Sequence, residues 1–321
     1  MFRRSLLATL FATPAFAQGG AAPWSPARSV RLIAPYAPGG GVDTSARLLA
    51  VPMTAALGQS VIVENRGGAG GAIGAAEVAR SAPDGLTVMI DALAHTVNPT
   101  LMRGLAFDYA TAFTPITQVL VWPQIMIVPA SLPVRTLEEF IAYAKARPGR
   151  LTYGSSGNAT AAHLAAALLT NRAGIDVTHV PYRGGAPALQ DLMGGNLSFV
   201  FATVASSMQL VQDGQVRALA VSSAERLPAL PNVPTVAEQG FAGYELNEWN
   251  GLYGPAGLPA PIVARWLAAT KTALADPTVR ARLETLGAVP VGSEPGAFAE
   301  YVRQQREAMG RIVRETGMEL G

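Results

Sequence analysis

The chain has 321 residues, of which 50% are hydrophobic and 14% are charged, so it can bury a large core and does not resemble a disordered protein. The formal net charge is only +2, and no stretch combines clustered Lys and Arg with aromatic residues, which argues against a nucleic-acid partner. Cysteine is absent, which excludes disulfides, thiolate metal sites and a cysteine nucleophile. A chain of this length commonly forms two domains.

The N-terminus has the three parts of a secretory signal. Arg3 and Arg4 precede an apolar stretch, and the sequence AFA ending at Ala17 matches a signal-peptidase site. This pattern predicts export to the periplasm with cleavage after Ala17; a cytosolic amphipathic segment is the alternative, and the paired arginines leave the Sec and Tat routes open. Residues 1–17 hold two of the 24 basic residues and none of the 22 acidic ones, so the rest of the chain has no net charge. No later apolar run is long enough to predict a membrane-spanning helix.

Strand and helix patterns alternate through the first hundred residues. Short apolar runs predict strands, and periodic apolar spacing after Gly-rich turns predicts helices. In chain order we predict strand 30–35, a Gly-rich turn, helix 44–57, strand 60–64, a second Gly-rich turn at 65–74 that leads into a helix, and strand 86–91. This alternation is typical of a parallel sheet with helical crossovers.

A second alternating series follows two strands, 116–121 and 124–128, that we expect to carry the chain out of the first domain. Its predicted elements are helix 137–146, strand 151–153, helix 160–171, strand 177–180, helix 186–193 and strand 197–201. Strands 216–221 and 247–254 lead back, and the last part of the chain predicts the helices 261–274, 278–286 and 295–316.

This order predicts an α/β fold in which two domains form a clamshell, each with a sheet sandwiched by helices. Domain 1 would comprise residues 27–123 and 248–321, and domain 2 would be inserted between them as residues 124–247. Folds of this kind bind ligands in the cleft at the carboxyl ends of their strands.

Three Gly-containing turns each follow a predicted strand and begin a predicted helix. They extend from Pro38 to Thr44, from Gly154 to Asn158 and from Tyr182 to Ala186. Free backbone N–H groups and the positive end of a helix dipole meet at such turns, so each is a potential anion site without a charged side chain. The alternative is that they are ordinary turns in which Asp43 or Ser156 only caps a helix.

No motif identifies an enzyme. GxxxxGK[ST] is absent, residues 67–74 do not match GxGxxG, and the serines near residue 155 are not in a GxSxG or SxxK motif. The three histidines, His95, His163 and His179, do not have the HExxH spacing of a zinc enzyme. We therefore expect no catalytic residues, metal or cofactor; an exported hydrolase that uses Ser155 or Ser156 is the remaining enzymatic alternative.

Seven segments of the sequence resemble the periplasmic solute receptors of tripartite tricarboxylate transporters, the Bug-type family. They include PARSVRLIAPYAPGGGVD (26–43), LTYGSSGNATAAHL (151–164) and HVPYRGGAPALQDLMGGNLSFVF (179–201), and together they extend over nearly the whole chain after the signal. The resemblance implies a type II periplasmic-binding fold that holds a small carboxylate through loop N–H groups and ordered water. It also implies the membrane subunits of such a transporter as transient partners. The subunit number is open, and a clamshell that must open favours a monomer. A sensory receptor that signals to a membrane protein is the alternative.

The resemblance further implies which residues line the ligand site. On domain 1 they are Tyr36, Gly39, Gly40, Asp43, Thr44, Ala94 and His95. On domain 2 they are Ser155, Ser156, Gly157, Asn158, Tyr182, Arg183, Gly184 and Ala202. Ala202 stands where the family usually has an acidic residue, and Ala159 stands where a glycine often follows Asn158. The missing acid disfavours an amino acid as the ligand.

Several of these side chains have an alternative, structural role. Asp43 could cap a helix instead of contacting a ligand, and His163 could pack or cap beside the site. Arg183 could steer an anion or form a surface ion pair. Trp249 is expected to pack at the crossing between the domains, and stacking on an aromatic ligand is the alternative.

Overall fold

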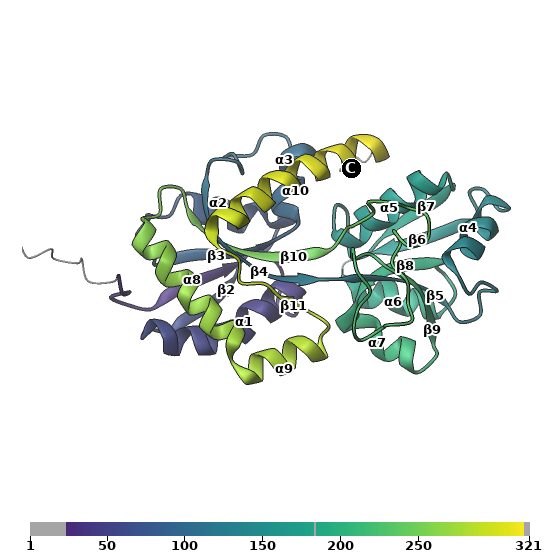
Figure 1. The fold of residues 1–321 in the computed structure, drawn as a ribbon. Coiled ribbons are helices and arrows are strands. Elements are labelled where there is room, and N and C mark those ends of the chain that lie inside the picture. The colour runs from purple at the N-terminus through teal and green to yellow at the C-terminus, as the bar shows by residue number, and fades with distance from the viewer. Residues whose placement is uncertain (1–23, 183, 318–321) are drawn as a thin grey trace, which may run out of the picture.

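The computed structural model describes residues 24–182 and 184–317. Two β-sheets, each flanked by helices, form two lobes that lie side by side (Figure 1). The predicted signal sequence with its cleavage after Ala17 lies outside the described residues, and so does Arg183. Within the described ranges, no helix is both long and apolar enough to cross a membrane.

The sheet of domain 1 has six strands in the order β11-β4-β10-β3-β1-β2. They are β1 (Val30–Ala34), β2 (Val61–Asn65), β3 (Thr87–Ala92), β4 (Phe113–Trp122), β10 (Glu248–Pro255) and β11 (Val289–Pro290). Strands β1, β2 and β3 are parallel, whereas β10 is antiparallel to both β3 and β4. The parallel arrangement expected for the first three strands is therefore present, and the sheet is mixed because β10 returns from the other domain and enters it in the opposite direction.

The sheet of domain 2 has five strands in the order β7-β6-β8-β5-β9. They are β5 (Gln124–Pro129), β6 (Leu151–Ser155), β7 (Val177–Pro181), β8 (Phe199–Thr203) and β9 (Val216–Val221). Strand β6 is parallel to β7 and β8, and β5 is antiparallel to β8 and β9. This sheet is mixed for the same reason, since β5 is the strand that enters it from domain 1.

Helices cover both faces of each sheet. Domain 1 has α1 (Gly41–Leu57), α2 (Ala72–Ala79), α3 (Ala94–Leu101), α8 (Ala260–Ala275), α9 (Pro277–Thr285) and α10 (Pro295–Thr316), with the 3-10 turn η1 (Ala69–Gly71) before α2. Domain 2 has α4 (Leu137–Lys145), α5 (Ala161–Ala173), α6 (Gly185–Met193) and α7 (Val204–Gln212). The sequence analysis did not predict α3 or α7; α3 is short and contains Pro99.

The strand directions determine which edges of the two sheets face each other. Trp122 ends β4 and pairs with Glu248, the first residue of β10. Pro123 alone separates Trp122 from Gln124, which begins β5 and pairs with Thr203 at the end of β8. The carboxyl ends of the parallel strands of each domain therefore lie on the edge that faces the other domain.

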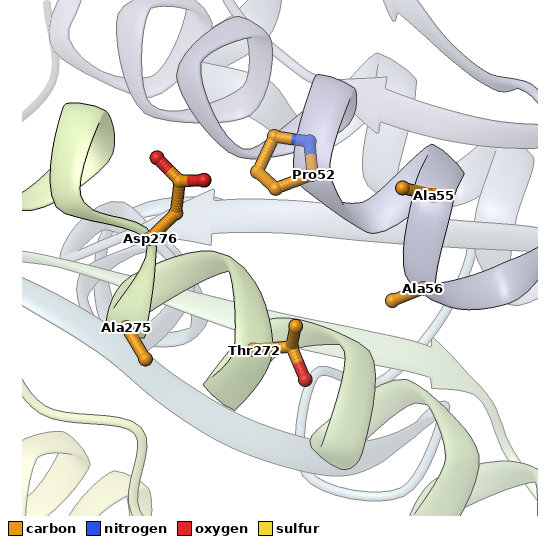
Figure 2. Close-up of a pocket in the computed structure, with 6 residues that line it drawn as sticks. All are labelled: Pro52, Ala55, Ala56, Thr272, Ala275 and Asp276. Atoms are coloured by element: carbon orange, nitrogen blue, oxygen red, sulfur yellow. The ribbon is translucent and has the colours of Figure 1, made fainter.

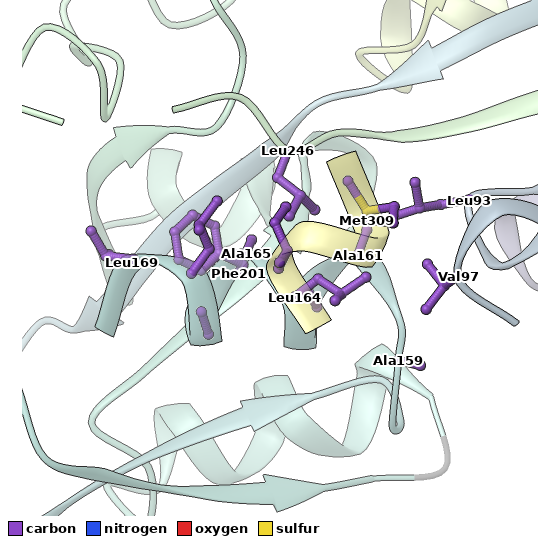
Figure 3. Close-up of a cluster of buried hydrophobic side chains, with 14 of the residues drawn as sticks. Leu93, Val97, Ala159, Ala161, Leu164, Ala165, Leu169, Phe201, Leu246 and Met309 are labelled. Atoms are coloured by element: carbon purple, nitrogen blue, oxygen red, sulfur yellow. The ribbon is translucent and has the colours of Figure 1, made fainter. Parts of the chain in front are cut away.

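A shared hydrophobic cluster also joins the lobes (Figure 3). Leu93 and Val97 from domain 1 belong to the same buried cluster as Leu164 of α5, and Met309 of α10 packs with them. Helix α10 thus reaches from its own domain to α5 of the other (Figure 1). Burial of this apolar surface stabilises the arrangement of the two domains.

The crossing strand β10 packs closely on α10. Trp249 is fully buried with its ring edge-on to Phe298 and Tyr301, as expected for a residue that packs at the crossing. Phe298 is also fully buried, and a Cβ atom at Gly251 would collide with its ring. The glycine is therefore required by the close approach of helix and strand.

We predict that Gly251→Ala lowers the free energy of unfolding by about 1–3 kcal/mol, because the new Cβ atom would overlap the fully buried ring of Phe298. Urea denaturation would measure the change. Gly296→Ala, at a position in α10 where a Cβ meets no atom within 4 Å, is the matched control and should change stability little. Equal effects of the two substitutions would contradict this packing.

Two histidines stack between α5 and β7. The rings of His163 and His179 have centroids 3.7 Å apart and planes inclined by 13°, and Tyr153 stacks on His179. Burial, with a smaller effect of His179, lowers the pKa of His163 to about 3, and burial lowers the pKa of His179 to about 4. Nδ1 of His163 accepts a hydrogen bond from the backbone N–H of Ala159 at 3.1 Å, so His163 packs and supports the preceding turn.

Because both buried imidazoles are neutral, we predict that the folded protein loses stability in acid. A histidine with a lowered pKa contributes stability above its unfolded pKa of about 6.5, and that stability is lost as pH falls toward the folded value. Each pH unit in this window costs up to about 1.4 kcal/mol for a histidine as buried as His163. The double variant His163→Gln/His179→Gln should therefore lose less stability than the wild type between pH 7 and pH 4.5 in urea denaturation. Parallel losses in both proteins would show that the pair is not the acid-sensitive element.

Candidate functional site

The turn between β1 and α1 forms the domain 1 side of the candidate site. Gly40 is the N-cap of α1, and both Gly39 and Gly40 are exposed. The carboxylate of Asp43 accepts hydrogen bonds at 2.9 Å from the backbone N–H of Gly39 and from the side chains of Arg47 and Asn65. Burial opposes ionisation of Asp43, but these hydrogen bonds outweigh it and lower its pKa. Asp43 therefore fixes the shape of the turn without being the N-cap, and it leaves the first N–H groups of α1 free of a capping side chain.

Asp91, at the end of β3, connects two of the predicted site residues. Its carboxylate accepts a hydrogen bond from the hydroxyl of Tyr36 at 2.9 Å and lies 2.9 Å from Nδ1 of His95. Tyr36 is partly exposed, whereas His95 is 1% exposed and stacks on Tyr253 at 4.1 Å. His95 thus lies beneath the surface of the candidate site and is connected to Tyr36 through Asp91. The sequence analysis missed Asp91, although a lone carboxylate in an apolar strand four residues before a histidine is a usable signal.

Glu248 is the second acidic residue that sequence analysis missed. Its Oε1 accepts hydrogen bonds from the backbone N–H groups of Leu93 at 2.9 Å and Trp249 at 3.1 Å. Leu93 immediately precedes α3, so Glu248 lies at the N-terminus of the helix that begins with the predicted site residue Ala94. Because the two partners are 155 residues apart in the chain, no local pattern could have predicted this contact.

The two turns of domain 2 are hydrogen-bonded to each other. The backbone N–H of Tyr182 donates to the carbonyl of Ser155 at 3.0 Å, and that of Gly184 donates to the carbonyl of Ser156 at 3.2 Å. Gly184 is the N-cap of α6, with a φ of 112° that favours glycine. The helix starts of α5 and α6 are thereby held side by side at the edge that faces domain 1.

Side chains in the first of these turns are largely structural. Thr160, not Ser156, is the N-cap of α5. Gly157 has a φ of 137°, and Ala159 adopts a left-handed φ of 59°, which strains any residue other than glycine. Asn158 is exposed, whereas Ser156 is partly buried. The Ala159 position therefore has the backbone shape of a glycine even though it carries a methyl group.

Tyr182 and Ala202 also belong to the predicted site of domain 2. The hydroxyl of Tyr182 donates to Asp191 of α6 at 2.5 Å, and burial together with that bond raises the pKa of Tyr182 to about 12. Ala202 is 8% exposed near the end of β8, paired with Ile125. Thr44, on the domain 1 side, is partly exposed in the first turn of α1. Ala202 provides no charge where the family resemblance implies an acid.

A serine and a histidine do meet in domain 2. Oγ of Ser155 lies 2.7 Å from Nε2 of His179, a contact that the sequence did not reveal. However, Ser155 is 1% exposed, and its hydroxyl donates to the carbonyl of Gly157 at 2.9 Å. In the described part of the chain no carboxylate bonds to His179, so the pair lacks the orienting group of a catalytic triad. The contact closes the turn instead of exposing a nucleophile.

Two cavities lie apart from most of the candidate residues. One of about 620 Å³ lies between α1 and α8, where Pro52, Ala56 and Asp276 are among the lining residues (Figure 2). Since α1 begins at the edge that faces domain 2, residues 52–56 lie toward its far end. The other, of about 410 Å³, lies beside α5 and β7 and includes His163 and Asn158. Only Asn158 belongs to the predicted ligand-binding set.

Comparison with known proteins identifies the family. The model of the tripartite tricarboxylate transporter family receptor matches residues 45–318. The solved structure of the periplasmic binding protein BugD is 34% identical, covers 92% of this chain and 99% of its own, and superposes with a TM-score of 0.81. Rpa4515 of R. palustris with adipate is also 34% identical, with the same coverage and a TM-score of 0.83.

MatC from Rhodopseudomonas palustris, with bound malate, is 34% identical over 90% of this chain and 99% of its own, with a TM-score of 0.79. These similarities confirm the predicted two-domain periplasmic-binding fold. The structures of these relatives are those of solute receptors, not of enzymes. The chain therefore belongs to the receptor family of tripartite tricarboxylate transporters, whose members are periplasmic solute-binding proteins.

Proposed function

We propose that this protein captures a small carboxylate between its two domains in the periplasm and delivers it to the membrane subunits of a tripartite tricarboxylate transporter. The observation that carries the proposal is the placement of helix starts from both domains on the two facing sheet edges. Backbone N–H groups at such positions attract an anion without requiring a lysine or arginine. The relatives that hold adipate and malate bind ligands of this chemistry.

The ligand site of this proposal includes the exposed and partly exposed residues of the predicted set, among them Tyr36, Ala94 and Tyr182, and the buried Ala202 near the end of β8. Gly39, Gly40 and Thr44 provide the start of α1, Ser156 to Asn158 provide the turn before α5, and Gly184 provides the start of α6. Arg47 is already paired with Asp43 at 2.9 Å. Its positive charge therefore balances the carboxylate of Asp43 and not that of the ligand. The site would then recognise its anion mainly through fixed dipoles and ordered water.

The proposal includes four further features of the chain. The signal sequence is cleaved after Ala17, and the mature protein acts as a monomer. Domain 1 consists of residues 27–123 and 248–321, with residues 124–247 inserted as domain 2. The protein has no enzymatic activity, which the buried, hydrogen-bonded state of Ser155 supports.

We expect a carboxylate to stabilise the mature protein, residues 18–321. A thermal-shift screen with malate, adipate, citrate and benzoate should identify at least one acid that raises the melting temperature. At a concentration about 100 times Kd, the added stability is about 2.7 kcal/mol. If no mono-, di-, tricarboxylic or aromatic acid raises the melting temperature, the proposed function is wrong.

Ala202 offers a test of where the anion binds. We predict that Ala202→Asp weakens binding of the best acid from the screen about tenfold or more relative to Ala202→Asn, because only the aspartate adds a negative charge near the bound carboxylate. The asparagine variant controls for the larger side chain at this buried position. Isothermal titration calorimetry would provide both dissociation constants, and equal values would place the ligand elsewhere.

A further inference from the structure

Glu248 occupies the point at which the chain returns to domain 1. It is the first residue of β10, and its register partner is Trp122, the last residue before the other crossing. Its charge is close enough to Tyr36, a predicted site residue, to contribute to the raised pKa of that phenol. Glu248 therefore lies between the crossing strands and the domain 1 face of the proposed ligand site.

The carboxyl group of Glu248 is held by one oxygen only. Oε1 accepts both backbone hydrogen bonds, from Leu93 and Trp249, which fix the orientation of the group. Among residues 24–182 and 184–317, no hydrogen bond involves Oε2, and the side chain is partly exposed. The second oxygen is thus available to another molecule.

No cation neutralises Glu248 within the described chain. The titratable groups around it are Asp91 on β3, which is paired with His95 on α3, Tyr36 before α1, Tyr301 on α10, and Glu245 before β10. Burial raises the pKa of Glu248 to about 7 and Asp91 adds to this, while the two backbone hydrogen bonds oppose it. Near neutral pH a large fraction of the molecules therefore carries a proton on this carboxyl group.

We propose, on the basis of the proposed function, that Glu248 is a specificity-determining residue that recognises a ligand carboxylate in its protonated state, with Oε2–H donating a hydrogen bond to a carboxylate oxygen. Ionised Glu248 would repel the same ligand. The protonated form of the residue thereby favours a carboxylate, whereas a ligand amino group would pair with the ionised form. Such a donor adds a charge-assisted hydrogen bond to a site otherwise composed of backbone N–H groups.

This arrangement makes affinity depend on pH with a definite sign. If the ligand binds only when Glu248 is protonated, the apparent dissociation constant is the intrinsic value divided by the protonated fraction. With a pKa of about 7, that fraction is large at pH 6 and small at pH 8. The apparent dissociation constant should therefore rise about tenfold from pH 6 to pH 8.

Calorimetric titration of the mature protein with malate and with adipate at pH 6, 7 and 8 tests the proposal. Glu248→Gln keeps an oxygen for the N–H groups of Leu93 and Trp249 and places a permanent NH₂ donor at the second position. This variant should bind with the affinity of the wild type at pH 6 and lose the pH dependence. Glu245→Gln, at an exposed acid three residues earlier, is the matched control and should retain it.

The outcomes separate this proposal from the proposed function. If malate and adipate bind the wild type with the same affinity at pH 6 and pH 8, or tighter at pH 8, the role of Glu248 is wrong although the receptor function stands. The same holds if Glu248→Gln weakens binding at pH 6 while its melting temperature equals that of the wild type. If neither acid binds the wild type at any pH, the proposed recognition of these carboxylates and the role of Glu248 both fail.

Discussion

At its first crossing the chain passes from one sheet to the other through a single residue, Pro123. The rest of the structure depends on this constraint. Because β4 ends and β5 begins at this point, each sheet must place the carboxyl ends of its parallel strands toward the other. The helices that follow those strands then begin on the facing edges. Connectivity, and not any one side chain, therefore sets the positions of the N–H groups that we propose attract the ligand anion.

The proposed anion site has few free charges of its own. Arg47 is neutralised by Asp43, and Ala202 is apolar. Two further acids near the domain 1 face are also restrained: Asp91 by Tyr36, His95 and a backbone N–H, and Glu248 by two backbone N–H groups. Burial makes ionisation of a carboxyl group costly, so Glu248 can become a donor without a change in structure.

Domain 2 also contains buried neutral groups. They are the stacked imidazoles of His163 and His179, which lie behind the turn that contains Asn158. His179 contacts Ser155, and His163 accepts the N–H of Ala159, so both imidazoles stabilise the turn that we assign to the ligand. Ala159 has a strained, left-handed φ, and these contacts must hold the turn in that conformation. The turn is thus shaped by the core behind it, and its own side chains contribute less.

The sequence alone determined the features that depend on neighbours in the chain. Apolar periodicity, glycines after strands and an N-terminal signal pattern are local, and they predicted the alternating elements, the three turns and the two-domain class. Tertiary structure decided the direction in which β5 and β10 enter their sheets, because pairing partners are chosen by packing over long separations. It also decided which polar groups meet: Glu248 reaches Leu93 from 155 residues away, and Asp91 joins Tyr36 across 55 residues. The burial of Glu248, which raises its pKa, exists only once the chain has folded.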